Sequence, residues 1–174
     1  MRVELASLER NGGKFAHNYQ PGELDLNEDR VTLVAPPRVT GWILQSDSRL
    51  TVRGEATAEL QLECDRCLKS VLIPVSSSFE VEYVTPDTYQ ADPAAELLDD
   101  DLSLSVFDGE VIDIDDLVRE QLLLALPSQI LCRQECKGLC PECGGDRNEA
   151  DCKCEEAVID PRWAGLKEIA NRES

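Results

Sequence analysis

The sequence predicts an α+β fold: an antiparallel β-sheet, either a meander or a partly closed barrel, with one core helix, a cysteine-rich zinc-knuckle segment and a terminal helix. Two runs of alternating apolar residues lie close together, one helical run ends at a proline, and six of the eight cysteines lie within 23 residues. We expect an α+β core over residues 1–130. A zinc-binding segment with a C-terminal helix, residues 131–174, is expected to pack as part of the same domain.

The two alternating runs predict a β-hairpin. Apolar side chains recur mainly at every second position in residues 58–64 and again in residues 71–83. Successive side chains of a strand point to opposite faces, so each run predicts a strand with one buried face. The short polar segment DRCLK joins the two strands and places Cys64 and Cys67 at the hairpin tip. Pro74 has no backbone N–H, which predicts an edge or a bulge at that point.

Three other segments belong to the same core. Residues 39–45 (VTGWILQ) predict a third strand. Residues 85–101 are polar, acidic and interrupted by prolines, which predicts a loop with at most one helical turn. Residues 102–114 (LSLSVFDGEVIDI) predict a short hairpin or a strand, with Asp108-Gly109 as the turn signal.

The clearest helix covers residues 113–126. Asp113 can cap its first turn, and Asp115 and Asp116 suit the positive end of the helix dipole. The apolar run LLLAL predicts deep burial of the last turns, and Pro127 ends the helix. A last helix is predicted within DPRWAGLKEIANRES at the end of the printed sequence, where the proline suits a first helical turn.

The cysteine spacing predicts a metal site. Two cysteines separated by two residues, as in Cys140-Pro-Glu-Cys143-Gly-Gly, can present both sulfur atoms to one ion from a tight turn. Four thiolates close a tetrahedral Zn²⁺ site to water, so the expected cofactor is a structural Zn²⁺. A redox dithiol is the alternative, but it needs a thioredoxin-like βαβ context that this sequence lacks.

The spacing ranks the candidate ligands without selecting four of them, since the eight cysteines can fill two sites, or the six within 23 residues can fill one site with two left over. Cys140 and Cys143 come first, then Cys136 with one or both of Cys152 and Cys154, and last Cys132, which lies nearest the predicted buried helix. Two interpretations of Cys64 and Cys67 are open. They can form half of a zinc site that Cys132 and Cys136 complete, or Cys64 can pack in the core while DRC forms a turn.

The charge of the chain bears on its partners. Asp and Glu number 35 against 17 Lys and Arg, and residues 70–118 contain 13 acidic residues and no basic one. Nucleic-acid binding relies on Lys and Arg that displace counterions from phosphates, so composition argues against direct RNA or DNA binding by this interval. The acidity either maintains solubility or binds a basic protein, with Asp99, Asp100 and Asp101 as candidate contacts.

Several functional classes find no support in the sequence. No window is long and apolar enough for a transmembrane helix, and the N-terminus lacks the apolar run of a secretory signal, so we expect a cytoplasmic protein without a membrane partner. His17 is the single histidine and lies far in sequence from every cysteine. With no phosphate-binding glycine loop and no nucleophile elbow, the sequence predicts a protein that is not an enzyme.

Four motifs occur in a fixed order: LECDRCL after an alternating strand, FDGEVIDIDDLVREQLLLALP, CKGLCPECGGDRN with a later C-x-C, and IDPRWAGLKEI. Together they resemble the YceD family, the large ribosomal RNA subunit accumulation proteins, over residues 62–169. The resemblance implies a bacterial cytoplasmic, non-enzymatic factor that supports accumulation or processing of 23S ribosomal RNA and ribosome biogenesis. It also implies that the C-terminal cysteine cluster varies across the family, which favours a self-contained C-terminal knuckle over a site shared with Cys64 and Cys67.

The resemblance and the charge together suggest an indirect role. An acidic protein tied to ribosomal RNA is expected to act through a basic protein, such as a large-subunit ribosomal protein or an RNA-processing enzyme. Direct RNA contact through a basic patch with Arg133, Lys137 and Arg147 is the first alternative. A zinc- or redox-responsive regulatory adaptor is the second, and it requires labile thiols.

Overall fold

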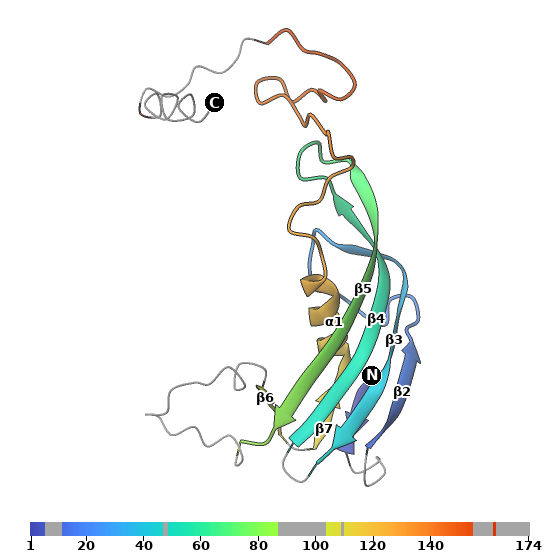
Figure 1. Cartoon of the computed structure of the whole chain (residues 1–174). Coiled ribbons are helices and arrows are strands. Elements are labelled where there is room, and N and C mark those ends of the chain that lie inside the picture. Colours follow the sequence, from blue (N-terminus) through green and yellow to red (C-terminus); the bar gives the residue numbers. More distant parts are fainter. Residues whose placement is uncertain (6–11, 47–48, 87–103, 109, 155–161, 163–174) are drawn as a thin grey trace.

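The computed structural model describes residues 1–5, 12–46, 49–86, 104–108, 110–154 and 162. Its elements, in chain order, are β1 (Arg2–Glu4), β2 (Gly12–Asn18), β3 (Thr32–Gln45), β4 (Arg49–Glu63), β5 (Ser70–Val84), β6 (Leu104–Val106), β7 (Val111–Asp113) and α1 (Ile114–Leu124). Figure 1 shows long, curved strands with α1 lying along one face of the sheet. No helix in these described ranges is long and apolar enough to cross a membrane.

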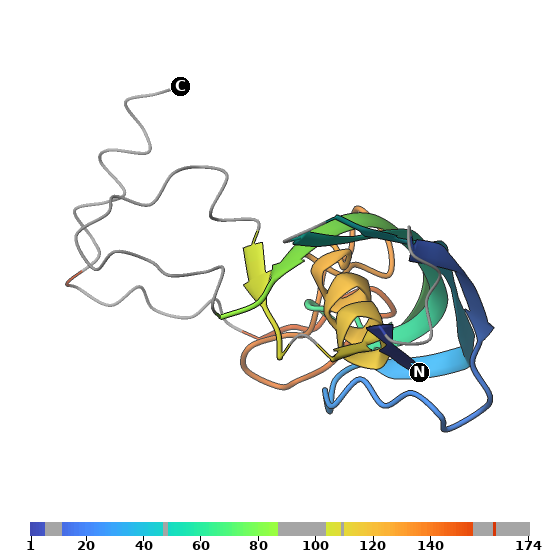
Figure 2. The same cartoon turned by 90° about the horizontal axis from the view of Figure 1, so that it is seen from below.

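The larger sheet has the strand order β2-β3-β4-β5-β6, and β2 to β5 are antiparallel to their neighbours in chain order. β6 pairs with the end of β5 in parallel, and β1 and β7 form a separate two-stranded antiparallel sheet. Viewed along the strands, the larger sheet curves around α1 (Figure 2). The described residues therefore form a mixed, mostly antiparallel sheet with one helix and a cysteine-rich region near the C-terminus.

The predicted hairpin is confirmed. β4 and β5 pair without a register shift from Arg49↔Val84 to Glu63↔Ser70. The alternating side chains of both strands face the core, where Leu60 and Val52 are fully buried. Pro74 lies opposite Glu59 in regular register, and in the described part of the chain β6 covers the other side of β5 only at Glu82–Val84. Pro74 thus occupies an edge, where its missing N–H removes no ladder hydrogen bond.

Two glycines of the sheet lie against aromatic rings of the neighbouring strands. Phe15, Gly41, Gly54 and Phe79 are successive partners across β2, β3, β4 and β5. A Cβ at Gly41 would lie 2.6 Å from Cζ of Phe15, and a Cβ at Gly54 would lie 2.7 Å from Cζ of Phe79. Because glycine has no side chain, the rings of Phe15 and Phe79 can lie over Gly41 and Gly54. Each ring shields the glycine backbone from water, as a side chain would at another residue.

The start of α1 follows the prediction. Asp113 is its N-cap and accepts hydrogen bonds from the backbone N–H groups of Asp115 and Asp116. Asp115 does more than complement the helix dipole, because its Oδ1 accepts a 2.7 Å hydrogen bond from the hydroxyl of Tyr19. Burial, followed by this hydrogen bond to a carboxylate, raises the pKa of Tyr19. The contact fixes the helix against the segment that follows β2.

The end of α1 corrects the prediction. The helix ends at Leu124 rather than residue 126, and only part of LLLAL is deeply buried. Leu122 is fully buried, whereas Leu124 is 70 % exposed. Helical periodicity explains the difference, because Leu122 lies on the same face as Val118 and Leu124 lies on the opposite face.

Of the two alternatives predicted for residues 102–114, a hairpin or a strand, the hairpin is wrong, although the segment does contain the strands β6 and β7. β6 joins the edge of β5, and β7 pairs with β1, so the two strands belong to different sheets. Asp108 still marks a turn, since its Oδ1 accepts from the N–H groups of Glu110 and Val111. The sequence also gave no indication of β1 and β2. Residues 87–101 of the predicted loop, and the predicted terminal helix except Arg162, lie outside the described residues.

The buried face of α1 yields a test of stability. Leu122→Ala is expected to lower the free energy of unfolding by about 2–5 kcal/mol, because it removes a fully buried side chain from the core. Leu124→Ala is the matched control, and this exposed change is expected to stay within about 0.5 kcal/mol of the parent. Urea unfolding followed by circular dichroism measures both. Equal losses in the two variants would contradict the assigned helix orientation.

The helix cap yields a test with a pH dependence. Partial burial opposes ionisation of Asp113, but hydrogen bonds from Arg2 and from the N–H groups of Asp116 and Asp115 lower its pKa below 3.8. Because the pKa of Asp113 is lower in the folded protein, its carboxylate stabilises the fold at pH values above the ordinary pKa of an Asp. This stabilisation is lost as the pH falls through the lowered pKa of the folded state.

Asp113→Ala is therefore expected to cost about 1 kcal/mol at neutral pH, whereas Asp113→Asn keeps a capping oxygen and costs less. The difference in free energy of unfolding between the parent and Asp113→Asn should become smaller in acid. Unfolding at a series of pH values measures this difference. An advantage that grows as the pH falls below 3.8 would rule out this account of the cap.

Candidate metal centres

Four cysteines from two distant parts of the chain meet at the tip of the β4–β5 hairpin. They are Cys64, Cys67, Cys132 and Cys136, here called the inner cysteine group, and their sulfur atoms all lie within 4.8 Å of one another. Sγ of Cys64 lies 3.8 Å from Sγ of Cys136, and Sγ of Cys67 lies 3.6 Å from Sγ of Cys132. Three of the four are buried, and Cys132 is exposed.

Backbone contacts bring the segment after α1 to the hairpin tip. The N–H of Asp65 donates to the carbonyl of Ile130 at 2.8 Å, and the N–H of Ile130 donates back to Oδ2 of Asp65 at 2.6 Å. Arg66 donates from Nη1 to the carbonyl of Cys136 at 2.7 Å and accepts from the N–H of Leu139 at 3.0 Å. These reciprocal hydrogen bonds position the two halves of the inner cysteine group.

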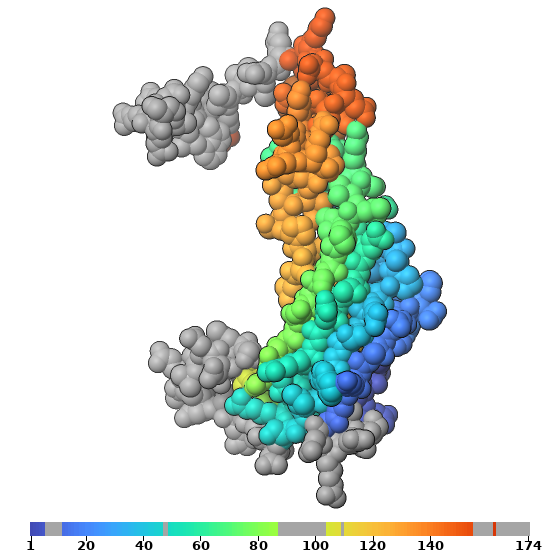
Figure 3. All heavy atoms as spheres, turned by 45° about the vertical axis from the view of Figure 1, so that its right-hand side comes forward, coloured from blue at the N-terminus to red at the C-terminus, as the bar shows by residue number. Residues whose placement is uncertain are grey.

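A second set of four cysteines comes from one short stretch. Cys140, Cys143, Cys152 and Cys154, here called the outer cysteine group, also have all their sulfur atoms within 4.8 Å of one another. Only Cys140 is buried. In the space-filling view, this stretch forms the end of the molecule beyond the hairpin tip (Figure 3).

The Cys-x-x-Cys turns of the two groups have the same backbone pattern. In the first turn, the N–H of Leu68 donates to the carbonyl of Cys64, and the N–H of Cys64 donates to the carbonyl of Lys69. The second turn repeats both bonds at Cys140, with Gly144 and Gly145 at the equivalent positions. The residue four places after the first cysteine has a positive φ in both turns, 59° at Leu68 and 69° at Gly144.

The same turns direct backbone N–H groups at sulfur. The N–H groups of Cys143 and Glu142 donate to the sulfur of Cys140, and they lower its pKa to about 6. Burial opposes ionisation of Cys64, but the N–H groups of Cys132, Arg66 and Cys67 donate to its sulfur and lower its pKa to about 6. In both turns these donors include the residues two and three places after the first cysteine. Such donors favour the thiolate, which is the form that binds metal.

The sulfur positions fit a tetrahedral ion. With a Zn–S distance of about 2.3 Å, two ligands of a regular tetrahedron lie about 3.8 Å apart. In the inner cysteine group, the sulfur atoms of Cys67 and Cys132 lie 3.6 Å apart, and those of Cys64 and Cys136 lie 3.8 Å apart. Four thiolates per group suit a soft or borderline ion such as Zn²⁺, and they leave no open coordination position for a substrate.

The structure arranges the candidate ligands differently from their sequence ranking. Cys136 lies with Cys64, Cys67 and Cys132, and not with Cys140 and Cys143. Of the two alternatives left open by the sequence, two sites filled by eight cysteines or one site with two of six cysteines left over, the structure contains two groups of four. The resemblance favoured a self-contained C-terminal knuckle over a shared site, and the structure contains both arrangements. Cys132 is part of the inner group because the segment after α1 turns away from the core to reach the hairpin tip.

Asn148 is a residue of the site that the sequence did not indicate. Its Nδ2 donates to Sγ of Cys136 at 3.4 Å and to Oδ1 of Asp146 at 2.7 Å. Its Oδ1 accepts from the N–H of Lys137 at 2.8 Å and from Nη2 of Arg133 at 2.7 Å. The side chain thus ties the stretch between Cys143 and Cys152 to the inner group. No spacing rule identifies such a contact, because it depends on the folded path of the segment.

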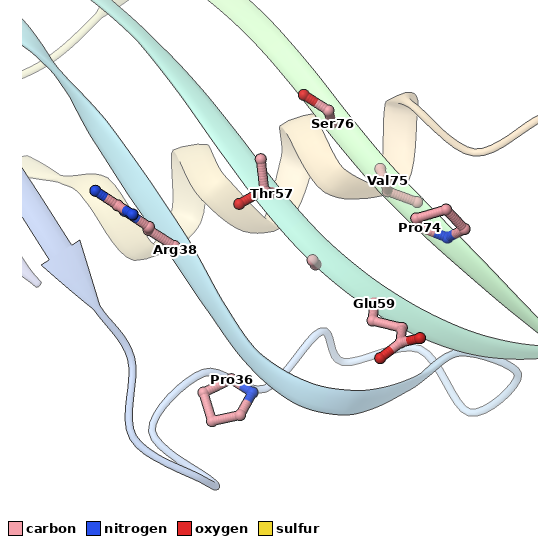
Figure 4. Close-up of a pocket in the computed structure, with 8 residues that line it drawn as sticks. Pro36, Arg38, Thr57, Glu59, Pro74, Val75 and Ser76 are labelled. Carbon is pink, nitrogen blue, oxygen red and sulfur yellow. The ribbon is translucent and has the colours of Figure 1, made fainter.

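The candidate partner-binding residues Asp99, Asp100 and Asp101 lie outside the described residues. A shallow hollow of about 390 Å³ lies on the face of the sheet away from α1 (Figure 4). Pro36 and Pro74 line it together with Arg38 and Glu59.

Comparison with known proteins places these features in a family. Residues 52–170 match the model of the YceD family, described as large ribosomal RNA subunit accumulation proteins. The chain belongs to the YceD family. The match includes the β4–β5 hairpin from Val52 onward, α1 and both cysteine groups.

Several curated proteins are similar to this YceD family member. An uncharacterized protein of Mycobacterium tuberculosis (strain ATCC 25618 / H37Rv) is 34% identical over an alignment of 188 residues, gaps included. The alignment covers 100% of this chain and 83% of the relative. The uncharacterized protein YlbN of Bacillus subtilis (strain 168) is 25% identical over 171 residues, 98% of this chain and 95% of the relative. An uncharacterized protein of Mycobacterium leprae (strain TN) is 31% identical over 118 residues, 68% of this chain and 52% of the relative. No solved structure matches the chain.

The contact at Gly138 gives a test of how the inner cysteine group is assembled. Gly138 has a φ of 73°, and a Cβ there would lie 2.9 Å from the carbonyl oxygen of Arg66. Gly138→Ala is therefore expected to move the segment off the hairpin tip and to increase the reactivity of the buried thiols of Cys64 and Cys136. Thiol titration of the metal-free, reduced protein with Ellman's reagent measures this reactivity.

Gly22→Ala is the control for Gly138→Ala. Gly22 also has a positive φ, 80°, but a Cβ there would meet nothing within 4 Å. Both variants carry the backbone strain of about 1–2 kcal/mol expected for a non-glycine residue in this region. Only Gly138→Ala adds a steric contact with the hairpin tip. Equal thiol reactivity in the two variants would show that the contact does not hold the segment.

Proposed function

We propose that this protein is a non-enzymatic cytoplasmic factor that supports accumulation of large-subunit ribosomal RNA by binding a basic protein, and that Zn²⁺ is the ion bound by its cysteines. The observation that carries the RNA-related role is the family match over residues 52–170. The observation that favours a protein partner over naked RNA is the excess of 35 acidic over 17 basic residues.

The charges at the cysteine-rich end support the choice of a protein partner. Residues 132–154 contain four basic and five acidic residues. Two of the basic side chains already have partners there, since Arg133 donates to Asn148 and Lys137 lies 3.6 Å from Asp151. Four thiolates around one Zn²⁺ add a net charge of about −2 per group. Metal binding therefore makes this end more negative, which disfavours contact with RNA phosphates.

Zn²⁺ is favoured by the donors and by the cellular compartment. Each group offers four sulfur ligands and no oxygen ligand, which excludes a preference for Mg²⁺ or Ca²⁺. In a reducing cytoplasm cysteines remain thiols and are available to a metal ion. A closed thiolate site stabilises structure and leaves catalysis without an open position.

An affinity pull-down from cells tests the proposed function. The tagged chain is expected to retain a basic protein after nuclease treatment of the lysate, and its association rate should fall as salt screens the charges. A gel-shift titration of the purified protein with large-subunit ribosomal RNA is expected to give no tight complex. Tight, salt-sensitive binding to that RNA would contradict the proposal of a protein partner and would identify RNA as the partner. Arg147 and Lys153 would then be the next residues to change.

Charge reversal separates a local contact from the effect of net charge. Replacing Asp99, Asp100 and Asp101 by Lys is expected to weaken the complex with the basic protein. Replacing Glu59, Glu63 and Glu135 by Lys changes the net charge equally at scattered exposed positions and serves as the matched control. If the control weakens the complex as much, the three aspartates are not a specific contact.

A further inference from the structure

We propose that the chain holds two Zn²⁺ ions that exchange at different rates: a slowly exchanging ion in the inner cysteine group, which fixes the cysteine-rich segment to the hairpin tip, and a readily exchanging ion in the outer cysteine group. This inference rests on the zinc binding in the proposed function and assigns a separate role to each group.

The shared turn geometry indicates that both groups bind metal. A positive φ is uncommon for a residue with a side chain, and in the described ranges only Asn27 and Leu68 have one outside glycine. Leu68 is also 53 % exposed, so packing of its side chain does not account for this conformation. The equivalent position in the outer turn is Gly144, with a similar φ. The turn at Cys64 therefore adopts, at a cost in backbone strain, the conformation that directs N–H groups at a thiolate.

The inner cysteine group is built to retain its ion. Its ligands belong to two segments about 70 residues apart, since Cys64 and Cys136 are separated by 72 positions and Cys67 and Cys132 by 65. Three of its sulfur atoms are in buried residues, packed against Val71, Leu131 and Leu139. A chelator can contact the exposed Cys132 directly, but it reaches the three buried ligands only after the hairpin tip and the segment after α1 separate, which breaks the hydrogen bonds of Asp65 and Arg66 described above. Release of this ion is thus coupled to local unfolding.

The loop between the ligands of the outer cysteine group is tied to the inner group through Asn148 and to the hairpin tip through Lys69, but the ligands themselves lack these restraints. All four ligands lie between Cys140 and Cys154, and three of them are exposed. None of the four belongs to a hydrophobic cluster among the described residues, whereas Cys64, Cys67 and Cys136 form one. An attacking chelator can reach the exposed sulfur atoms of Cys143, Cys152 and Cys154 directly. Loss of this ion leaves the inner group and the sheet core in place, so the outer group can respond to the zinc available in the cell.

Two matched variants test the proposal in the full-length protein. Cys67→Ser and Cys143→Ser each remove the second cysteine of a Cys-x-x-Cys turn, one in each group. Elemental analysis of the protein purified without added metal is expected to give two Zn²⁺ per chain, and one in each variant. Zinc release to the chromogenic chelator 4-(2-pyridylazo)resorcinol is expected to be biphasic in the parent, with one fast and one slow phase, because release from the inner group requires local unfolding.

Each variant is expected to lose one phase. Cys143→Ser should keep the slow phase, and Cys67→Ser should keep the fast one. Glu135→Gln, an exposed change between ligands of the inner group, should keep both. If Cys67→Ser does not fold, Cys132→Ser removes the exposed ligand of the same group and should abolish the slow phase. Cobalt substitution provides a second measurement, because tetrahedral Co²⁺–thiolate absorption reports each filled group.

Three results would overturn the proposal. They are a single ion per chain in the parent, one common release rate in all variants, and a fast phase that disappears in Cys67→Ser instead of Cys143→Ser. These measurements use purified protein and no partner, so their failure would leave the pull-down test of the proposed function intact. Failure of the pull-down would equally leave the two release rates as measured.

Discussion

The reciprocal hydrogen bonds between Asp65 and Ile130 are the contact on which the cysteine-rich end of the molecule depends. They join the tip of the longest hairpin to the segment that leaves α1. Ile130 is buried in the main core, and Cys132 and Cys136 follow it after two and six positions. Together with the hydrogen bonds that join Arg66 to Cys136 and Leu139, this contact fixes the relation between the two halves of the inner cysteine group, although Cys64 and Cys136 are 72 positions apart in the sequence.

The position of this contact is set by α1 and its neighbours. Asp113 fixes where the helix begins, and the buried face that includes Leu117 and Leu122 fixes how it lies on the curved sheet. The helix then ends near the middle of the sheet, and the following segment runs on along β4 and β5 to their tip (Figure 1). The core therefore determines where the cysteines meet, and the hydrogen bonds at the tip determine their spacing.

The features that sequence reasoning predicted are those that depend on neighbouring residues. The alternation in β4 and β5, the cap at Asp113 and the Cys-x-x-Cys turns are local patterns, and the structure contains each of them. β1 and β7 are three-residue strands that pair across more than 100 positions, and such short segments carry no periodic signal. The grouping of Cys136 and the contact of Asn148 with its sulfur also depend on long-range folding, which cysteine spacing alone does not encode.

The acidic residues within residues 70–118 show why the net charge of the chain is a better guide to its partners than the number of acidic residues in one segment. Glu80 and Glu82 pair with Arg53 and Arg49, and Asp113 pairs with Arg2, so several of these carboxylates stabilise the fold. Each such pair uses a cation as well as an anion. With 35 acidic and 17 basic residues, one-to-one pairing of every cation would still leave 18 carboxylates without one. Because this excess belongs to the whole chain, it favours any positively charged surface, and a specific contact must be distinguished from that general effect by variants of equal net charge.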